Sequence, residues 1–247
     1  MKPWDIVSEI LKAMAAMAKP GVTTLEINDM AEQMIRDYKV VACNKGYQPT
    51  WAKIPFPTAT TININFIIAH GIPTEYKLME GDVVSLDLGI KKDGQCADAA
   101  LTVGVGEISN KARHLLKYAK RIMDDGIEAM GPGVSTRKIA EVISQSTARY
   151  GYKVNRRFAG HTIGTEMHMK PNIFNSVEKV HEGKYADLVP GQIVCIEPMI
   201  TLGSDDLGIV TSNSWETITN DARISVFFEH MVLITETGHE VLTNHIE

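Results

Sequence analysis

Four carboxylates and one histidine of this sequence could hold divalent metal ions. The first two, Asp87 and Asp98, flank Asp93-Gly94, a dipeptide typical of tight β-hairpin turns. A hairpin centred on this dipeptide, or one residue earlier, brings both carboxylates to one face, opposite or diagonal to each other. Two carboxylates so placed repel each other unless a cation lies between them. The pair therefore fits either a metal site or two separate surface acids.

The other two carboxylates stand in apolar runs. Glu197 directly follows Ile193-Val194-Cys195-Ile196, and Glu229 lies within the run 226–234. A carboxylate in such surroundings is costly unless it is paired or bound to a metal. Glu229 could instead point to solvent from an alternating strand, but its run is nearly continuous rather than alternating.

The histidine is His161, which lies in the segment Gly160-His161-Thr162-Ile163-Gly164. Glycines let backbone approach closely around a site, although a single histidine is more often structural than a ligand. Together with the four carboxylates it makes an oxygen-rich set that suits Mn, Co, Fe(II) or Zn, and not a thiolate zinc site. Two such ions, about 3.5–4 Å apart, can share carboxylate bridges and assist a hydrolytic displacement.

An internal repeat indicates how these residues are positioned. Residues 20–40 and 132–154 both begin Pro-Gly-Val-Thr/Ser-Thr and both end Tyr-Lys-Val. A second pair of blocks, 81–87 and 191–197, consists of β-branched runs that each end in a carboxylate. Two matched blocks at nearly constant offset favour two similar halves over two coincidentally similar capped helices. Because no linker separates them, we expect one domain over residues 1–247, with halves of about 1–108 and 109–247.

The apolar periodicity predicts the elements that carry these blocks. Thr23 and Ser135 are suited to cap helices, and Glu26 completes a capping box with Thr23. Helices are expected over 4–18, 24–37, 109–130 and 135–150. Strands are expected over 60–68, 82–90, 96–105, 192–197, 208–211, 224–235 and 239–243. This order predicts the α/β class in its α+β form, with mostly antiparallel sheet covered by helices.

Composition narrows the class of protein. The 247 residues are 44% hydrophobic with a formal net charge of −5, so a broad basic surface for DNA is not expected. Three cysteines without CxxC spacing indicate reduced thiols. No signal peptide or membrane span is evident, because the longest uncharged run, 54–74, contains three prolines. We therefore expect a cytoplasmic protein that is not bound to membranes.

At this point the residues resemble the type I methionine aminopeptidases. The resemblance runs from about Lys19 to Thr243 and rests on the order and spacing of several segments. These segments are Lys19-Pro20-Gly21-Val22, Ala69-His70-Gly71-Ile72-Pro73, Asp87 with Asp98, Gly160-His161 with His168, Ile196-Glu197-Pro198-Met199, and Glu229-His230. It implies the pita-bread fold of two pseudo-symmetric halves, in which Asp87 and Glu197 are equivalent.

The resemblance also implies roles. Asp87 would be a terminal ligand of one metal ion, His161 and Glu197 ligands of the other, and Asp98 and Glu229 bridging ligands. His70 and His168 would be catalytic residues that steady the scissile peptide, and Glu197 would also move the proton. The implied reaction removes the N-terminal methionine of peptides and nascent proteins with a hydroxide held between two metal ions. The family suggests a monomer.

Several positions depart from the family pattern. Phe56 and Trp215 match the expected aromatic walls of the methionine pocket, but Thr61 stands where cysteine is common and Met167 where phenylalanine is common. These four side chains would still form an apolar, flexible pocket for a thioether. Outside the pocket, the sequence has three further departures, at Met169, Lys170 and Phe227. They leave the proposed ligands intact, while substrate preference and rate stay open.

Two other functions remain as alternatives. One is a pita-bread aminopeptidase of Xaa-Pro specificity, favoured by Asp87-Leu88-Gly89 but opposed by Arg157, where those relatives usually carry histidine. The other is a pita-bread binding protein without catalysis. A basic helix over 111–121 could also dock on the ribosome, although a solvated helix face is the simpler interpretation.

Overall fold

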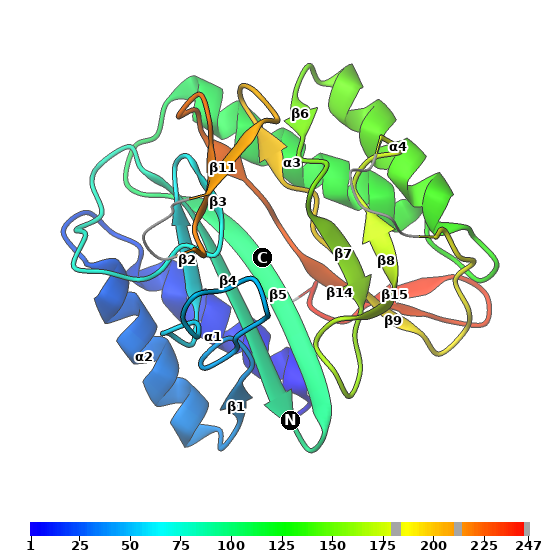
Figure 1. Cartoon of the computed structure of the whole chain (residues 1–247), viewed down its shortest axis with the longest axis horizontal. Helices are drawn as coiled ribbons and strands as arrows, with labels where there is room; N and C mark the ends of the chain where they lie inside the picture. The colour runs from blue at the N-terminus through cyan, green and yellow to red at the C-terminus, as the bar shows by residue number, and fades with distance from the viewer. Residues whose placement is uncertain (179–183, 210–213, 245–247) are drawn as a thin grey trace.

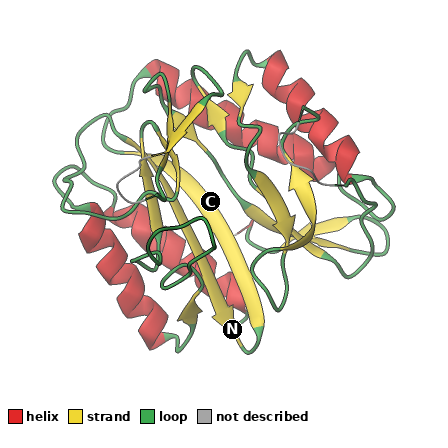
Figure 2. Cartoon of the chain, viewed as in Figure 1, coloured by secondary structure: helices red, strands yellow, loops and turns green. Residues whose placement is uncertain are grey.

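Two pairs of helices frame the molecule. The computed structural model describes residues 1–178, 184–209 and 214–244. Its helices are α1 (Pro3–Met17), α2 (Thr24–Asp37), α3 (Asn110–Glu128) and α4 (Thr136–Arg149). Each lies within two residues of its predicted range at both ends. Figure 2 shows α1 with α2 and α3 with α4 on opposite sides of the molecule, with most strands between them.

The caps of the helices confirm the sequence signals. The Thr23 hydroxyl accepts a hydrogen bond from Glu26 N, and the Glu26 carboxylate accepts one from Thr23 N at 2.7 Å, which is the predicted capping box. The Ser135 hydroxyl accepts from Arg137 N at the start of α4. These bonds satisfy backbone donors that the first helical turn leaves without a partner.

The first half is built around one long hairpin. Strand β4 (Val83–Lys92) pairs with β5 (Gln95–Gly104) over its whole length. The other edge of β4 is shared by β1 (Val41–Ala42) and β2 (Thr61–Ile64). Helix α1 packs on this sheet through buried residues of its apolar face, which belong to the same core as Leu86 and Leu88. Helix α1 thus covers one face of the hairpin (Figure 1).

The second half contains a five-stranded sheet. Its order is β15-β14-β9-β7-β8, with β7 (Ala159–Thr162), β8 (Met169–Phe174), β9 (Ile193–Ile196), β14 (His230–Ile234) and β15 (His239–Val241). Helices α3 and α4 pack together, and their buried residues share one core with β9 and β14. In Figure 1 this half lies beside the hairpin of the first.

Two small sheets complete the fold. One has the order β13-β10-β6, from Ser225–Val226, Ile200–Thr201 and Lys153–Val154. The other has the order β11-β12-β3, from Leu207–Ile209, Thr217–Thr219 and Ile67–Ala69. Every strand pair of the described residues is antiparallel, which confirms the predicted mixed class of helices and antiparallel sheet.

Matching backbone contacts occur at the two repeat blocks. An isolated bridge joins Thr23 to Lys77 before α2, and another joins Ser135 to Asp187 before α4. The partners are offset by 112 and 110 residues, the offsets found in the sequence. Two similar halves would be expected to form matching bridges of this kind. The division of the chain into two halves of one domain stays a prediction.

The structure corrects two strand predictions. The range 60–68 is two strands, because Asn65 has a positive φ of 52° and turns the chain between them. The range 224–235 is also two strands, interrupted at 227–229. Of the predicted strand 208–211, residues 210 and 211 lie outside the described part. Short strands β1, β6, β10 and β12, and both β7 and β8, were not predicted.

No helix in the described part of the chain is both long and apolar enough to cross a bilayer.

Candidate metal centre

All eleven predicted site residues line one cavity of about 310 Å³. The cavity lies between the β4–β5 hairpin and the second-half sheet. The predicted residues are Phe56, Thr61, His70, Asp87, Asp98, His161, Met167, His168, Glu197, Trp215 and Glu229. The structure therefore brings together residues that lie up to 173 positions apart in the sequence. The role of each residue remains a prediction.

The hairpin positions its two aspartates as the turn signal implies. Asp93 and Gly94 have positive φ values of 50° and 83°, as a two-residue turn of this kind requires. The resulting register sets Asp87 opposite Ala100 and Asp98 opposite Gly89. Asp87 and Asp98 thus share one face and are diagonal neighbours, which is one of the two predicted arrangements.

Glu229 reaches the cavity through the break between β13 and β14. Its backbone forms an isolated bridge with Ala100 of β5, in which Glu229 N donates to Ala100 O at 2.9 Å. Ala100 lies opposite Asp87 and two residues beyond Asp98. The bridge therefore places the Glu229 carboxylate, only 2% exposed, beside both aspartates.

His161 faces the carboxylates with one ring nitrogen and the backbone with the other. Its Nε2 lies 3.7 Å from Asp98 Oδ2 and 4.0 Å from Glu197 Oε1. Its Nδ1 lies 3.2 Å from Thr162 O, a distance that fits donation to this carbonyl. Such a bond fixes the tautomer that leaves Nε2 free to bind a metal.

Burial disfavours the charged forms of all these groups. It raises the pKa of Asp87, Glu197 and Glu229 well above the usual range, and repulsion from Asp98 raises each of them further. Burial raises the pKa of Asp98 to about 7 and lowers the pKa of His161 to about 4. Crowded, dehydrated carboxylates of this kind become favourable when a cation neutralises them.

Two buried oxygens support a bound cation directly. Asp98 Oδ1 and Glu229 Oε1 have no hydrogen-bond partner among the described residues. Such oxygens are rare in folded proteins, because each costs about 1–3 kcal/mol when it has no partner. The donor set, mainly carboxylates with one imidazole, fits a hard or borderline divalent ion. The residues present therefore fit a metal site.

The structure adds Cys195 to this cluster. Ligand atoms of Asp98, His161, Cys195 and Glu229 all lie within 4.8 Å of one another. Burial raises the pKa of the Cys195 thiol well above its usual range, with further contributions from Glu229 and Asp98. The thiol is therefore protonated at neutral pH and can donate to Glu229. The sequence signal for Cys195 was its position two residues before Glu197 in the predicted strand 192–197.

Thr61 does more than line the side-chain pocket. It lies opposite Asp87 in the β2–β4 pairing, and its hydroxyl donates to Asp87 Oδ2 at 3.0 Å. Buried Asn63 donates to the Thr61 hydroxyl at 3.2 Å and accepts from Gly71 N at 2.8 Å. This chain of bonds fixes Asp87 and, through Gly71, the neighbouring His70.

The apolar side of the cavity is aromatic. The Phe56 and Trp215 rings meet edge to face at 5.1 Å, and Trp215 Nε1 donates to Ile54 O at 2.9 Å. Met167 fills the space above Gly89, where an added Cβ would lie 2.1 Å from Met167 Cε. Any side chain at position 89 would therefore require the flexible end of Met167 to move.

Two histidines and three further aromatic rings, from Tyr47, Trp51 and Phe158, line the same cavity. The His168 ring lies 4.5 Å from that of His161, and burial lowers the pKa of both His168 and His70, the latter to about 4. Both are therefore neutral near pH 7. Tyr47 and Trp51 also line the cavity and were not predicted, because their loop has no periodic pattern.

Comparisons with known proteins agree with this geometry. The sequence model of the metallopeptidase family M24 matches residues 2–236, so the chain belongs to this family. A methionine aminopeptidase of Aquifex aeolicus is 33% identical over 243 residues, 98% of this chain and 93% of that one. The crystal structure of methionine aminopeptidase from Rickettsia prowazekii superposes with a TM-score of 0.90 at 29% identity, covering 98% of this chain and 94% of the other.

A more distant structure shares the fold alone. The Xaa-Pro dipeptidase of Bacillus anthracis has a TM-score of 0.74 at 21% identity, and the match covers 98% of this chain but 58% of that one. The architecture is thus the pita-bread fold of the M24 metallopeptidases, as predicted. A metallopeptidase binds a metal ion, and the buried cluster of Asp98, His161, Cys195 and Glu229 is a candidate site for it.

Proposed function

We propose that this protein is a metal-dependent methionine aminopeptidase, which hydrolyses the peptide bond after an N-terminal methionine. The observation that supports this proposal most strongly is that one cavity holds the buried carboxylate–histidine cluster beside an apolar pocket of Phe56, Met167 and Trp215. Such a pocket suits the flexible, polarisable thioether of methionine. The named relatives with nearly full coverage support the same activity.

Five residues would hold two divalent ions. We assign Asp87 as a terminal ligand of one ion, His161 and Glu197 as ligands of the other, and Asp98 and Glu229 as shared ligands. The donor set is compatible with Co, Mn, Fe(II) or Zn. When bound, such ions polarise a carbonyl and lower the pKa of water, which is the chemistry that peptide hydrolysis needs.

The side chains of this chain supply positioning and proton transfer. The pKa of Glu197 is raised by burial, so this carboxyl is suited to take a proton from water and give it to the leaving amine. His70 and His168 are neutral and line the cavity from opposite halves of the chain. We assign them to hold the scissile carbonyl and the peptide N–H by hydrogen bonds.

A direct test compares peptide substrates with Mn or Co added. Methionine release from a Met-Ala peptide, with little hydrolysis of an Ala-Pro peptide, is the expected result. A preference for the Xaa-Pro bond would select the alternative specificity, and no release with any divalent ion would contradict the proposal. As a control, Asp98→Asn keeps the shape of the side chain but removes its charge, and we expect it to be inactive.

The non-catalytic alternative has its own test. A binding protein should keep its cellular function after the loss of a metal ligand, whereas an aminopeptidase should lose it. Complementation by Asp98→Asn, at wild-type protein levels, would therefore favour a binding role. The buried cluster argues against this alternative, because it destabilises the fold unless it is neutralised.

We further expect a cytoplasmic monomer that acts on nascent chains as they are made. Contact with the ribosome through α3 is less well supported, because two of its basic residues are neutralised within the helix. Lys120 pairs with Asp124 at 3.2 Å and Arg121 with Asp125 at 2.7 Å. Charge reversal of Lys111 and Arg113 that abolishes co-sedimentation with ribosomes would establish such contact.

A further inference from the structure

A second cavity adjoins the catalytic one. It has a volume of about 280 Å³, and four of its lining residues also line the first cavity: Trp51, His70, Phe158 and Trp215. The remaining lining residues are Arg157, Leu207, Ser214 and Thr217. The two cavities therefore share a wall of three aromatic rings and the imidazole that we place beside the scissile peptide.

Trp51 stands at the junction of the two cavities. Its ring meets that of Trp215 at 4.9 Å, nearly edge to face, and lies 6.4 Å from that of His70. The side chain is nevertheless 57% exposed. An exposed indole that lines two cavities offers a large apolar surface for a ligand at little cost in conformational entropy.

The loop that carries Trp51 is fixed to the second half. Lys53 N donates to the Ser214 hydroxyl at 3.0 Å, and Trp215 Nε1 donates to Ile54 O at 2.9 Å. These bonds join residues 161 positions apart on either side of the cavity. The backbone that follows Trp51 is therefore held in place before any ligand arrives, which reduces the entropy cost of binding.

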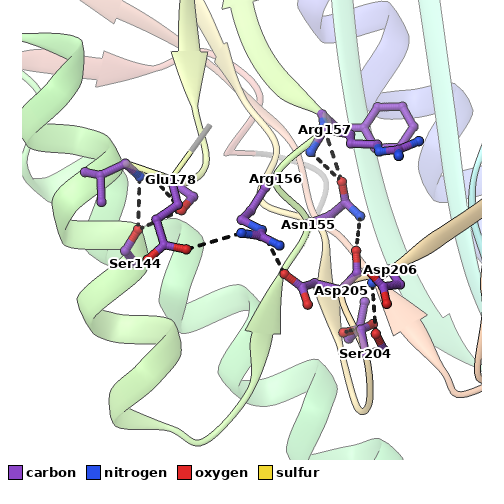
Figure 3. A network of polar contacts seen from close by, with 12 residues as sticks. Ser144, Asn155, Arg156, Arg157, Glu178, Ser204, Asp205 and Asp206 are labelled. Carbon is purple, nitrogen blue, oxygen red and sulfur yellow. Dashed lines mark hydrogen bonds and ion pairs between the residues drawn. The ribbon is translucent and has the colours of Figure 1, made fainter. Parts of the chain in front are cut away.

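The opposite wall is fixed by a network of polar contacts (Figure 3). The Asn155 side chain accepts from Arg157 N at 2.8 Å and from Phe158 N at 3.3 Å, and donates to Asp205 O. Arg156 pairs with Asp205 at 2.9 Å and with Glu178 at 3.2 Å. The backbone beside the second cavity is therefore held in place as well.

An extended peptide that starts in the first cavity would continue toward the second, because the two cavities share lining residues. Successive side chains of an extended peptide point to opposite sides, and alternate ones are about 6.7 Å apart. The methionine side chain would lie against Phe56 and Trp215, so the third residue of the substrate would point to the same side. It would meet Trp215 and Trp51, which line both cavities.

We propose that the second cavity binds the side chain of the third substrate residue and selects an apolar one, with Trp51 as the main determinant. This inference rests on the proposed aminopeptidase function. The lining is mainly aromatic and aliphatic, from Trp51, Phe158, Leu207 and Trp215. Among the described residues of this lining Arg157 is the single cation, so an acidic third residue is the competing preference.

The test varies the third residue of a Met-Ala-Xaa peptide among Gly, Leu, Phe and Asp. We expect kcat/KM for Leu or Phe to exceed that for Gly about tenfold, mainly through KM, because the cavity removes the apolar side chain from water. Trp51→Ala should reduce the Leu-to-Gly ratio to about two, and Trp51→Phe should restore much of it. Leu207→Ala, at the other wall, should change the ratio in the same direction.

Met79→Ala is the matched control. Met79 is also 57% exposed but lines neither cavity, so its loss should leave the Leu-to-Gly ratio unchanged. Equal rates for Gly, Leu and Phe in the wild type would overturn the proposal, as would an unchanged ratio in both Trp51→Ala and Leu207→Ala. A preference for Asp would overturn it in favour of carboxylate binding by Arg157. Failure to release methionine from any peptide would instead contradict the proposed function.

Discussion

Glu229 and Ala100 are joined by two backbone hydrogen bonds, one from Glu229 N to Ala100 O at 2.9 Å and one from Ala100 N to Glu229 O at 3.4 Å. Ala100 belongs to the hairpin that carries Asp87 and Asp98, and Glu229 comes from the second half. The bridge closes the carboxylate cluster across the two halves. A cation bound there would offset the repulsion between the carboxylates that the bridge brings together.

The stability of the metal-free protein should therefore fall as the pH rises. Burial holds the pKa of Asp98 at about 7 and the pKa values of Asp87, Glu197 and Glu229 well above their usual range. The folded chain keeps carboxyl protons that the unfolded chain loses near pH 4, which lowers the free energy of unfolding as the pH rises. The lowered pKa values of His70, His161 and His168 act in the opposite direction up to about pH 6.5, so the decrease should be steepest above that pH. Thermal unfolding in a chelator, measured from pH 5 to 8, checks this.

Added Mn should reverse this trend, because metal binding favours the ionised carboxylates and stabilises the folded state. Asp98→Asn, without metal, should be more stable than the wild type at pH 8, since one buried charge is gone. A metal-free wild type that becomes more stable between pH 5 and 8 would show that the cluster carries no such repulsion.

Removal of the Thr61 hydroxyl should weaken metal binding. Thr61→Val keeps the shape of the side chain but loses the 3.0 Å hydrogen bond to Asp87 Oδ2. Loss of a partner that orients a ligand typically costs about 10–100-fold in metal affinity. Titration with Mn measures this, and Thr61→Ser should bind nearly as tightly as the wild type. Equal Mn affinities for Thr61→Val and the wild type would show that the Thr61 hydroxyl does not contribute to metal binding.

A side chain at Gly89 should disturb the methionine pocket. In Gly89→Ala the new Cβ would lie 2.1 Å from Met167 Cε, so the flexible end of Met167 must move. We expect kcat/KM for a Met-Ala peptide to fall about tenfold, with most of the change in KM. Met167→Leu combined with Gly89→Ala should recover part of the loss. A wild-type kcat/KM for Gly89→Ala alone would show that the methionine side chain of the substrate does not bind beside Met167.

The sequence could reveal the hairpin, because its evidence is local. A period of two and one Asp-Gly turn are enough to put Asp87 and Asp98 on one face. The Glu229–Ala100 bridge is different, since it pairs residues 129 positions apart and interrupts a strand that apolar character alone extends through Glu229. The apolar run around Glu229 made it a candidate ligand, and the family resemblance implied its bridging role, but neither indicated its pairing with Ala100.

The loop residues escaped prediction for a related reason. Tyr47 and Trp51 lie in a segment that has no helical or strand period, so only the tertiary structure places them at the cavity. Thr61 was assigned to the substrate pocket by resemblance, but its hydrogen bond to Asp87 depends on the register of β2 against β4. A one-residue shift of that register would have turned the hydroxyl to the other face.

The most direct test of the central claim is to measure methionine release and bound Mn per chain on the same samples. The protein is stripped with a chelator, Mn is added back in steps, and Glu229→Gln is measured beside the wild type. We predict that release of methionine from a Met-Ala peptide rises with Mn bound at these ligands, to two ions per chain, and that the variant binds less and stays inactive. Full release from the stripped wild type, or Mn binding by the variant at wild-type affinity, would contradict the account.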